Sequence, residues 1–435
     1  MTPFDIGLIA LAVMIVLVLC GLTVPVALMA CSFVGVWAIR GSPELAANMM
    51  TLAASDTIAS YFFGVVPLFV LMGFLVSESG MGRDAFDVAN HAFRRIKGGL
   101  GVGTVGANAI FAAITGISIA SAAVFTKIAV PQMMRNGYSP RFATGVVAGS
   151  SVLGMLIPPS LLLILYGVLT EQSIGDLFIA GIGPGLVLSV AFGIGIVATA
   201  AFAPRWLGQP RVPQEGELSR GQILAKGLPI VILIVLVLGG IYGGVFTPVE
   251  AGAIGAIGAL ILGIAKGTLS LRGIGRVLIE TGLVTASICF LIIAAQMYSR
   301  MLSFSGLPAG FGAFVVDAEL GLLAVLALYC AVVIAMGMIL DSSSIMLILV
   351  PLMLPVMTDF GVDLIWFGIV TVIAVEIGLL TPPFGISVYV IKSTLDDPRI
   401  TLGDIFIGAA PFALAMLAVL ILVIAFPVIA TGLVP

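Results

Sequence analysis

Charge is the scarcest property of this chain. Lys, Arg, Asp and Glu make up 9% of its 435 residues, whereas about a quarter of an ordinary soluble domain is charged. His91 is the only histidine, and four cysteines lie inside apolar runs without the spacing of metal ligands: Cys20, Cys31, Cys289 and Cys330. These shortages exclude a soluble globular protein and argue against a disulfide framework or a metal centre. The net charge of −3 gives no indication of a nucleic acid partner.

Apolar residues dominate instead, forming 61% of the chain and giving a mean hydropathy of +1.27. A helix needs about 20 apolar residues to span a lipid bilayer. Such runs occur at ten places: 5–22, 23–40, 57–78, 141–170, 175–203, 227–244, 246–265, 276–298, 363–394 and 402–430. The sequence therefore predicts an all-α polytopic membrane protein. No Lys or Arg precedes the first run, so we expect a retained span and not a cleaved signal peptide.

Two further apolar segments, 98–134 and 320–357, are interrupted in the middle by small or polar residues. The interruptions are Thr115-Gly116-Ile117-Ser118 and Asp341-Ser342-Ser343-Ser344. We interpret each segment as a re-entrant hairpin, which enters the membrane and leaves on the same side. The alternative is a pair of ordinary spans in each place, and it leaves the sidedness of the flanking loops unchanged.

Two of the predicted spans, 141–170 and 363–394, contain a glycine and a double proline in corresponding positions, at 154–160 and 378–384. Proline lacks a backbone donor and breaks a helix. Broken backbone at membrane depth needs a cavity, an ion or a protein neighbour to satisfy its freed polar groups. A matched pair of broken spans therefore indicates a transport site.

The two breaks belong to a longer internal repeat. Matching residues recur at offsets of 220 to 226 positions: Pro25 with Pro248, Ser77 with Ser303, Pro131 with Pro351, and Gly154 with Gly378. We predict a first repeat at 1–203, a polar cytoplasmic linker at 204–226 and a second repeat at 227–435. Five crossings per half is an odd number, so the second repeat is inverted relative to the first.

The basic residues predict the orientation. One arrangement of the ten crossings places most of the 18 Lys and Arg residues on one face, leaving Arg40 and Arg300 on the other and Lys127 inside the first hairpin. Because Lys and Arg favour cytoplasmic loops, that face is the cytoplasm. Both termini are then predicted to be periplasmic. The first hairpin opens to the cytoplasm and the second to the outside.

The residue types at the breaks favour small hard cations. Such ions prefer neutral carbonyl and hydroxyl oxygens, which the broken segments supply, over imidazole or thiolate. Candidate ligands in the first half are Ser118, Ser121, Ser150, Ser151 and the turn at 154–159. Their counterparts are Gly337, Asp341 to Ser344 and the turn at 378–384, where Thr381 adds a hydroxyl. For any single Ser or Gly the alternative is helix packing.

Carboxylates and one lysine lie close to these elements. Intramembrane carboxylates are functional candidates by default, and Asp341 is positioned to ligate a cation or carry a proton. Glu376 is either a similar candidate or a capping group within the bundle. Lys127 contacts an anionic substrate or extends toward the cytoplasmic surface. An intramembrane serine hydrolase with Ser118 or Ser121 as nucleophile and Lys127 as base leaves the matching serines of the second half unexplained.

These residues together resemble a known family, the large DctM-like membrane subunit of tripartite ATP-independent periplasmic (TRAP) transporters in the ion transporter superfamily. The resemblance covers essentially the whole chain. It rests on five segments: 244–252, the tip at 118–122, the turn at 156–160, Asp341 with the serines that follow it, and 378–385.

The resemblance implies a sodium-coupled importer of organic anions in a bacterial inner membrane. Dicarboxylates, 2-oxo acids and sugar acids such as sialic acid are the expected substrates. The implied partners are a small four-helix membrane subunit, expected on a separate chain, and a periplasmic substrate-binding protein. An elevator mechanism is also implied, in which a domain holding both hairpins and both broken helices slides against the other spans.

Carried over residue by residue, the resemblance assigns one sodium site to Ser118, Ser121, Gly154, Ile157 and Pro159. It assigns the other to Gly337, Asp341, Ser342, Gly378, Thr381 and Phe384. The substrate is expected to meet seven residues of the same segments: Ser118, Ser121, Ser160, Asp341, Ser342, Thr381 and Pro382. Two alternatives remain from the residues alone, a stand-alone carrier without a binding protein and a passive channel or scaffold.

Overall fold

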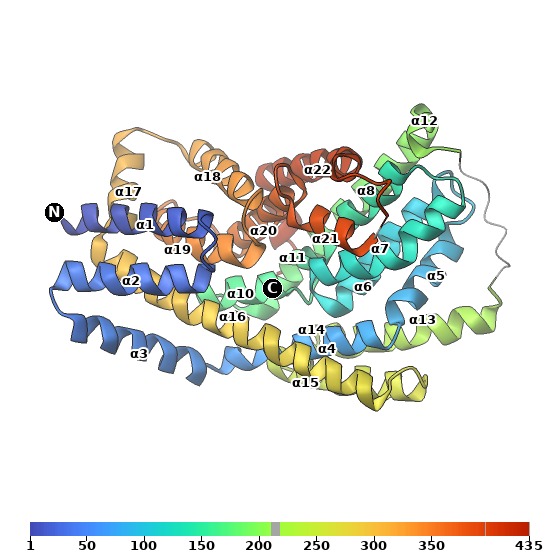
Figure 1. Cartoon of the computed structure of the whole chain (residues 1–435), viewed down its shortest axis with the longest axis horizontal. Coiled ribbons are helices and arrows are strands. Elements are labelled where there is room, and N and C mark those ends of the chain that lie inside the picture. The colour runs from blue at the N-terminus through green and yellow to red at the C-terminus, as the bar shows by residue number, and fades with distance from the viewer. Residues whose placement is uncertain (210–217, 396, 435) are drawn as a thin grey trace.

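The computed structural model of the chain is a bundle of helices that run roughly along one long direction (Figure 1). It describes residues 1–209, 218–395 and 397–434. Within those residues the only β-type pairing is an isolated bridge between Tyr138 and Gly208. The predicted all-α fold is confirmed. Part of the predicted linker, 210–217 with Arg211, lies outside the described residues.

The helices of the first half, in chain order, have these bounds: α1 (Pro3–Leu19), α2 (Val24–Arg40), α3 (Pro43–Ala59), η1 (Tyr61–Gly64), α4 (Val65–Glu78), α5 (Met81–Phe93), α6 (Gly99–Thr115), α7 (Ser118–Arg135), α8 (Pro140–Ser151), α9 (Leu153–Leu156), α10 (Leu161–Thr170), α11 (Ile174–Phe202) and α12 (Pro204–Leu207). Those of the second half are α13 (Arg220–Ile234), η2 (Val235–Gly239), α14 (Gly240–Tyr242), α15 (Pro248–Ala265), α16 (Leu271–Ser305), α17 (Leu307–Asp317), α18 (Leu322–Gly337), α19 (Ser342–Asp359), α20 (Leu364–Leu380), α21 (Ile386–Leu395), α22 (Leu402–Ala425) and α23 (Val428–Thr431).

Seven helical stretches in the described residues are long and apolar enough to cross a membrane, and an eighth is added if α4 and α5, bent by 66°, count as one span. Six of the seven coincide with predicted crossings: Pro140–Thr170, Ile174–Phe202, Arg220–Tyr242, Pro248–Ala265, Leu271–Ser305 and Leu402–Ala425. The seventh is α19, which we predicted as one arm of a hairpin. The predicted number of ten crossings is therefore confirmed only in part.

The remaining differences have local causes. The helices α1 and α2 have 17 residues each and fall just short of a full span by length. The predicted span 57–78 is interrupted, because α3 ends at Ser60 in extended backbone and the chain restarts through η1 and α4. In the second half, α13 begins at Arg220, inside the predicted linker. A reciprocal capping box between Ser219 and Gln222 starts it there.

The two predicted hairpins are both helix–turn–helix units. Helices α6 and α7 pack on each other, as do α18 and α19. In Figure 1, α6 and α7 lie toward the end of the molecule that carries α5 and α12, and α18 and α19 lie toward the end that carries the N-terminus and α17. Their tips therefore point toward the middle of the molecule from opposite ends.

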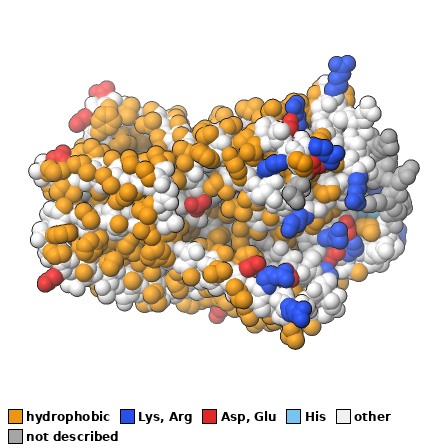
Figure 2. All heavy atoms as spheres, in the orientation of Figure 1, with side chains coloured by type: hydrophobic (Ala, Val, Ile, Leu, Met, Phe, Trp, Pro, Cys, Tyr) orange, Lys and Arg blue, Asp and Glu red, His pale blue; other side chains and the backbone are white. Residues whose placement is uncertain are grey.

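Basic side chains gather at one end of the molecule, on the right in Figure 2, and isolated acidic side chains mark the other end. At the basic end, ion pairs join α5 to its neighbours: Asp87 contacts Lys226 of α13, and Asp84 contacts Lys266 at the end of α15. Arg141 of α8 and Asp404 of α22 form a further pair at 2.7 Å. These pairs link α5 to α13 and α15, and α8 to α22, at the basic end of the molecule.

Helices α8 and α22 pack through two glycines, which lets their backbones touch. A Cβ atom added at Gly145 would lie 2.8 Å from the Cα atom of Gly408 and closer still to its carbonyl group. Backbone atoms cannot move aside as the end of a flexible side chain can. This contact attaches the first broken helix to the last long helix of the chain.

We predict that Gly145→Ala lowers the free energy of unfolding by about 1–3 kcal/mol, because the new methyl group overlaps the backbone of α22. Thermal unfolding of the purified protein in detergent measures the change. The matched control is Gly193→Ala in α11, where an added Cβ atom meets nothing within 4 Å. Equal melting temperatures for the two variants would contradict this packing.

Candidate functional site

The first hairpin tip lies on the first helix break. The tip turns at Gly116, which has a positive φ of 64°, and its carbonyl accepts a hydrogen bond of 3.1 Å from the amide of Leu161. A Cβ atom at Gly154 would lie 3.2 Å from the amide nitrogen of Ser118. Glycine at these positions therefore allows the tip and the break to touch backbone to backbone.

The second tip and the second break are arranged in the same way. The carbonyl of Met338 accepts hydrogen bonds from the amides of Phe384 (3.2 Å) and Gly385 (3.3 Å). Gly337 and Gly378 meet face to face, since a Cβ atom on Gly337 would lie 2.7 Å from the Cα atom of Gly378. Each break thus receives the tip of the hairpin from its own half.

The second arms of the hairpins also reach across to the other half. Helix α7 of the first hairpin packs on α21, which follows the second break, and α19 of the second hairpin packs on α10, which follows the first. The hydroxyl of Tyr166 in α10 donates a 2.6 Å hydrogen bond to the carbonyl of Leu364 at the start of α20. The two tip-and-break units therefore form one connected centre.

Several polar atoms at this centre are buried without a hydrogen-bond partner. Ser118 and Ser121, at the start of α7, are fully buried, and neither hydroxyl oxygen has a partner. An unpaired buried hydroxyl costs about 1–3 kcal/mol. A buried hydroxyl oxygen whose lone pairs are not used within the protein is suited to binding an ion or ligand. Their predicted roles as sodium and substrate ligands stay predictions.

Other predicted residues are already engaged within the protein. Ser160 is fully buried, and its hydroxyl donates to the carbonyl of Met155 while it accepts from the amide of Leu163 at 3.2 Å. It therefore caps α10 at its amino end. Asp341 caps α19 in the same way, accepting from Ser344 at 3.1 Å. The hydroxyl of Thr381 donates to the carbonyl of Ile377 at 2.7 Å and keeps its lone pairs.

The two breaks differ in exposure. In the first, Pro159 and Gly154 are buried and Ile157 is partly buried. In the second, Pro382 is exposed and Phe384 keeps 52% of its surface accessible. Phe384 lines an open groove of about 360 Å³ together with five other residues: Ile339, Ile386, Tyr389, Val390 and Ser393.

Two polar residues at the centre were not clearly predicted from the sequence, which left the role of Glu376 open and did not indicate Asn108. Glu376 in α20 is 1% exposed, and its Oε1 atom accepts a 3.1 Å hydrogen bond from the hydroxyl of Ser342. Asn108 in α6, which we did not predict, donates to the hydroxyl of Ser150 at 2.6 Å. Polar residues in otherwise apolar helices were the available signal for both. Their neighbours, however, come from distant parts of the sequence.

A polar cavity of about 430 Å³ lies beside the centre, between α3, α10 and α16. Arg300 lines it and pairs with Asp56 at 2.6 Å, while Glu171 and Gln296 line other parts of the wall. Arg300 is one of the two basic residues predicted for the outer face. The cavity offers both charge and hydrogen-bonding groups to a water-soluble molecule.

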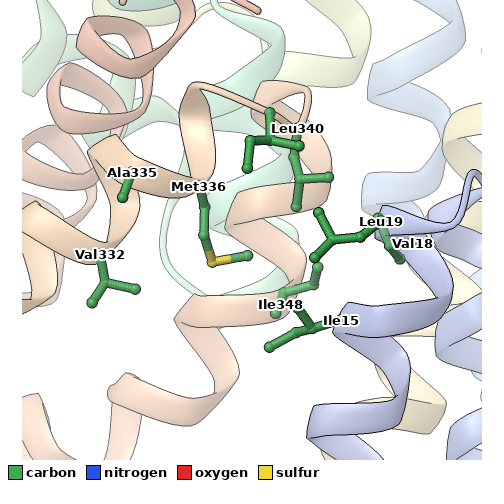
Figure 3. Close-up of a pocket in the computed structure, with 9 residues that line it drawn as sticks. Ile15, Val18, Leu19, Val332, Ala335, Met336, Leu340 and Ile348 are labelled. Atoms are coloured by element: carbon green, nitrogen blue, oxygen red, sulfur yellow. The ribbon is translucent and has the colours of Figure 1, made fainter. Parts of the chain in front are cut away.

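A second cavity, of about 280 Å³, is apolar and separates α1 from the second hairpin (Figure 3). Its walls come from α1 on one side and from α18, α19 and the tip between them on the other: Ile15, Val18, Leu19, Val332, Ala335, Met336, Ile339, Leu340 and Ile348. The lining offers no charged or hydrogen-bonding side chain to an anion. This cavity instead marks loose packing between α1 and the hairpin.

The arrangement does not support a serine hydrolase. Lys127, the proposed base, lies on α7 with its side chain exposed, whereas Ser118 and Ser121 are fully buried. Neither serine hydroxyl is hydrogen-bonded to this lysine, so the nucleophile–base pair that such an enzyme requires is not formed.

Comparison with known families agrees with this geometry. The family described as "Tripartite ATP-independent periplasmic transporter, DctM component" matches residues 11–429. The chain belongs to this family. It is thus a TRAP large permease, a transport subunit and not an enzyme, and a multi-pass protein of the inner membrane.

Individual relatives resemble this DctM-family chain over nearly its whole length. A C4-dicarboxylate TRAP large permease of Pseudomonas aeruginosa is 33% identical over 90% of each chain. A sialic acid TRAP large permease of Vibrio cholerae is 31% identical over 83% of each. An ectoine and 5-hydroxyectoine TRAP large permease of Ruegeria pomeroyi is 31% identical over 96% of each.

Solved structures share the fold at low sequence identity. The YdaH transporter of Alcanivorax borkumensis superimposes with a TM-score of 0.61 at 15% identity, covering 86% of this chain and 88% of that one. MtrF of Neisseria gonorrhoeae gives a TM-score of 0.60 at 12% identity, covering 86% and 83%. At such identities the likeness concerns the fold alone.

The structure makes Ser160 a helix cap, and this role is testable against the predicted role in substrate binding. We expect Ser160→Ala to lower the free energy of unfolding by about 1 kcal/mol, because α10 loses a capping bond. Ser160→Thr keeps the hydroxyl and serves as the control. Thermal unfolding and substrate uptake are measured together. A tenfold weaker apparent substrate affinity with unchanged stability would show that Ser160 binds substrate instead.

Proposed function

We propose that this DctM-family permease is the large membrane subunit of a sodium-coupled importer of a small organic anion. The observation that carries the proposal is the pair of hairpin tips, each seated on a helix break, with Ser118 and Ser121 buried and without partners beside them. Buried, unpaired hydroxyl groups destabilise a fold, and a cation that takes these two oxygens as ligands would offset that cost.

We assign one sodium site to each hairpin tip and the helix break on which it lies. In the first, Ser118 and Ser121 supply hydroxyl oxygens, and Gly154, Ile157 and Pro159 supply carbonyl oxygens. In the second, the ligands come from six residues of the other tip and break: Gly337, Asp341, Ser342, Gly378, Thr381 and Phe384. Neutral oxygens with few charges suit an alkali cation. The closeness of Gly154 to Ser118 and of Gly337 to Gly378 supports both assignments.

The substrate is proposed to bind between the two tips. Helices α7 and α19 begin at Ser118 and Ser342, so the positive ends of their dipoles face this region. An anionic group is stabilised there without a buried Arg or Lys. The relatives named above carry C4-dicarboxylate, sialic acid or ectoine in their descriptions. We expect a solute of similar size, with a carboxylate as its shared feature.

The structure also supports the inverted repeat and an elevator motion. Both hairpins and both broken helices interlock through the α7–α21 and α10–α19 contacts, which favours their moving as one body. The apolar cavity between α1 and the second hairpin, seen in Figure 3, is a place where such a body separates from the scaffold. Rigid sliding keeps every tip-and-break hydrogen bond intact.

The partners and the orientation complete the proposal. A tripartite system requires a periplasmic substrate-binding protein and a small four-helix membrane subunit. Some relatives have both membrane parts in one chain, such as the isethionate TRAP permease of Oleidesulfovibrio alaskensis, of which this chain spans 62%. The basic end in Figure 2 is proposed to face the cytoplasm. Labelling of a single cysteine at Gln209 by an impermeant maleimide only from the cytoplasmic side tests this orientation.

Transport in proteoliposomes tests the coupling. With the binding protein and the small subunit present, we expect substrate uptake driven by an inward sodium gradient and none in choline. Ser121→Ala removes a cation ligand and should raise the sodium concentration for half-maximal uptake by about tenfold. Thr381→Ala should do the same through the second site.

The matched control is Ser287→Ala in α16, where the exposed hydroxyl donates to the carbonyl of Leu283 at 2.9 Å. It should behave as the wild type. Uptake that persists at full rate in choline would reject sodium coupling and favour a passive channel. Uptake by this chain without its partner proteins would instead favour a stand-alone carrier.

A further inference from the structure

Glu376 lies where the two hairpin tips meet. It is the only charged residue that is buried in the described part of the chain. Its Oε1 atom accepts the hydrogen bond from Ser342 at the second tip, and the hydroxyl of Ser118, at the first tip, lies beside the same carboxyl group. One carboxylate therefore touches an element from each half of the molecule.

This carboxylate has no cationic partner in the protein. None of the ion pairs among the described residues includes Glu376. Its second oxygen, Oε2, has no hydrogen-bond partner, and the hydroxyl of Ser118 makes no hydrogen bond to any protein group other than this carboxyl. A buried carboxylate is costly unless its charge is compensated. A negative group surrounded by spare hydroxyl oxygens is complementary to a small cation.

Resting on the proposed function, we propose that Glu376 is the anionic ligand of a sodium ion held between the two hairpin tips. The hydroxyl oxygens of Ser118 and Ser342 would be its neutral ligands. This position would lie between the two sites described above, sharing Ser118 with the first and Ser342 with the second, whereas each of those sites takes all its ligands from one half. An ion bound here fastens both tips to α20 at once, so it couples the two halves of the transport site.

A purely structural role for Glu376 makes a different prediction. If the side chain only accepts the hydrogen bond from Ser342, glutamine replaces it, because the amide oxygen is an equivalent acceptor of the same shape. If it balances the charge of a cation, glutamine keeps the fold and loses the ion. Glu376→Gln therefore separates the two roles.

The experiment follows thermal unfolding of the purified full chain as sodium chloride replaces choline chloride at constant ionic strength. We expect sodium to raise the melting temperature of the wild type. Glu376→Gln should need about tenfold more sodium, or more, for the same rise. The control is Thr371→Val, also buried in α20, where the hydroxyl bonds to Tyr329 and to the carbonyl of Phe367. It should shift the melting temperature equally at every sodium concentration.

Glu376→Asp provides a second test if the glutamine variant does not fold. Aspartate keeps the negative charge, but its side chain is one methylene shorter and holds the carboxylate further from the ion. This variant should therefore need more sodium than the wild type for the same rise in melting temperature. The midpoint is the sodium concentration that gives half of the rise in melting temperature. If both variants fold and both have the midpoint of the wild type, the inference is overturned. The same holds if only the aspartate variant folds and its midpoint is that of the wild type. If those midpoints are unchanged while sodium still drives uptake, only the role of Glu376 fails. A wild type that neither responds to sodium nor takes up substrate with it contradicts the proposed function as well.

Discussion

The structure depends on one constraint, that hydrocarbon offers no hydrogen bonds to a helix that stops inside it. Both broken helices stop within the bundle, and each obtains a hydrogen-bond partner from a hairpin tip. The carbonyl of Gly116 accepts from Leu161, and the carbonyl of Met338 accepts from Phe384 and Gly385. Glycines make these contacts possible, because only a residue without a side chain lets two backbones come so close. The position of each tip is therefore dictated by the break that it satisfies.

The positions of the tips also determine where the polar side chains between them lie. Ser118, Ser121 and Glu376 lie at the ends of apolar helices, and the fold leaves some of their oxygens unpaired. In a soluble protein, water would satisfy these atoms. Here their burial carries a cost that the cation proposed above would offset. The two halves interlock around these atoms through α7 with α21 and α10 with α19.

The sequence was informative wherever the signal was local. Gly154 and Gly378 with their double prolines identified both breaks, and the polar interruptions identified both hairpin tips. The interruption at η1 was not predicted, because a single serine, Ser60, within a largely apolar run gives no signal that a helix ends there. The capping role of Ser160 at α10, beside its predicted role as a substrate ligand, became visible only in the structure. The role inferred for Glu376 depends on its contacts with Ser118 and Ser342, which are 258 and 34 positions away along the chain. Neighbours of that kind are set by the tertiary fold and leave no pattern within a window of sequence.

The account rests on a cation that joins the buried oxygens between the tips. High-resolution density maps of the permease with its membrane partner, recorded in sodium and in choline, test this most directly. We predict density in sodium alone, within bonding distance of Ser118 and Ser121, with both tips still seated on their breaks. Maps that are identical in the two salts, with the hydroxyls of Ser118 and Ser121 turned to protein partners, would contradict it.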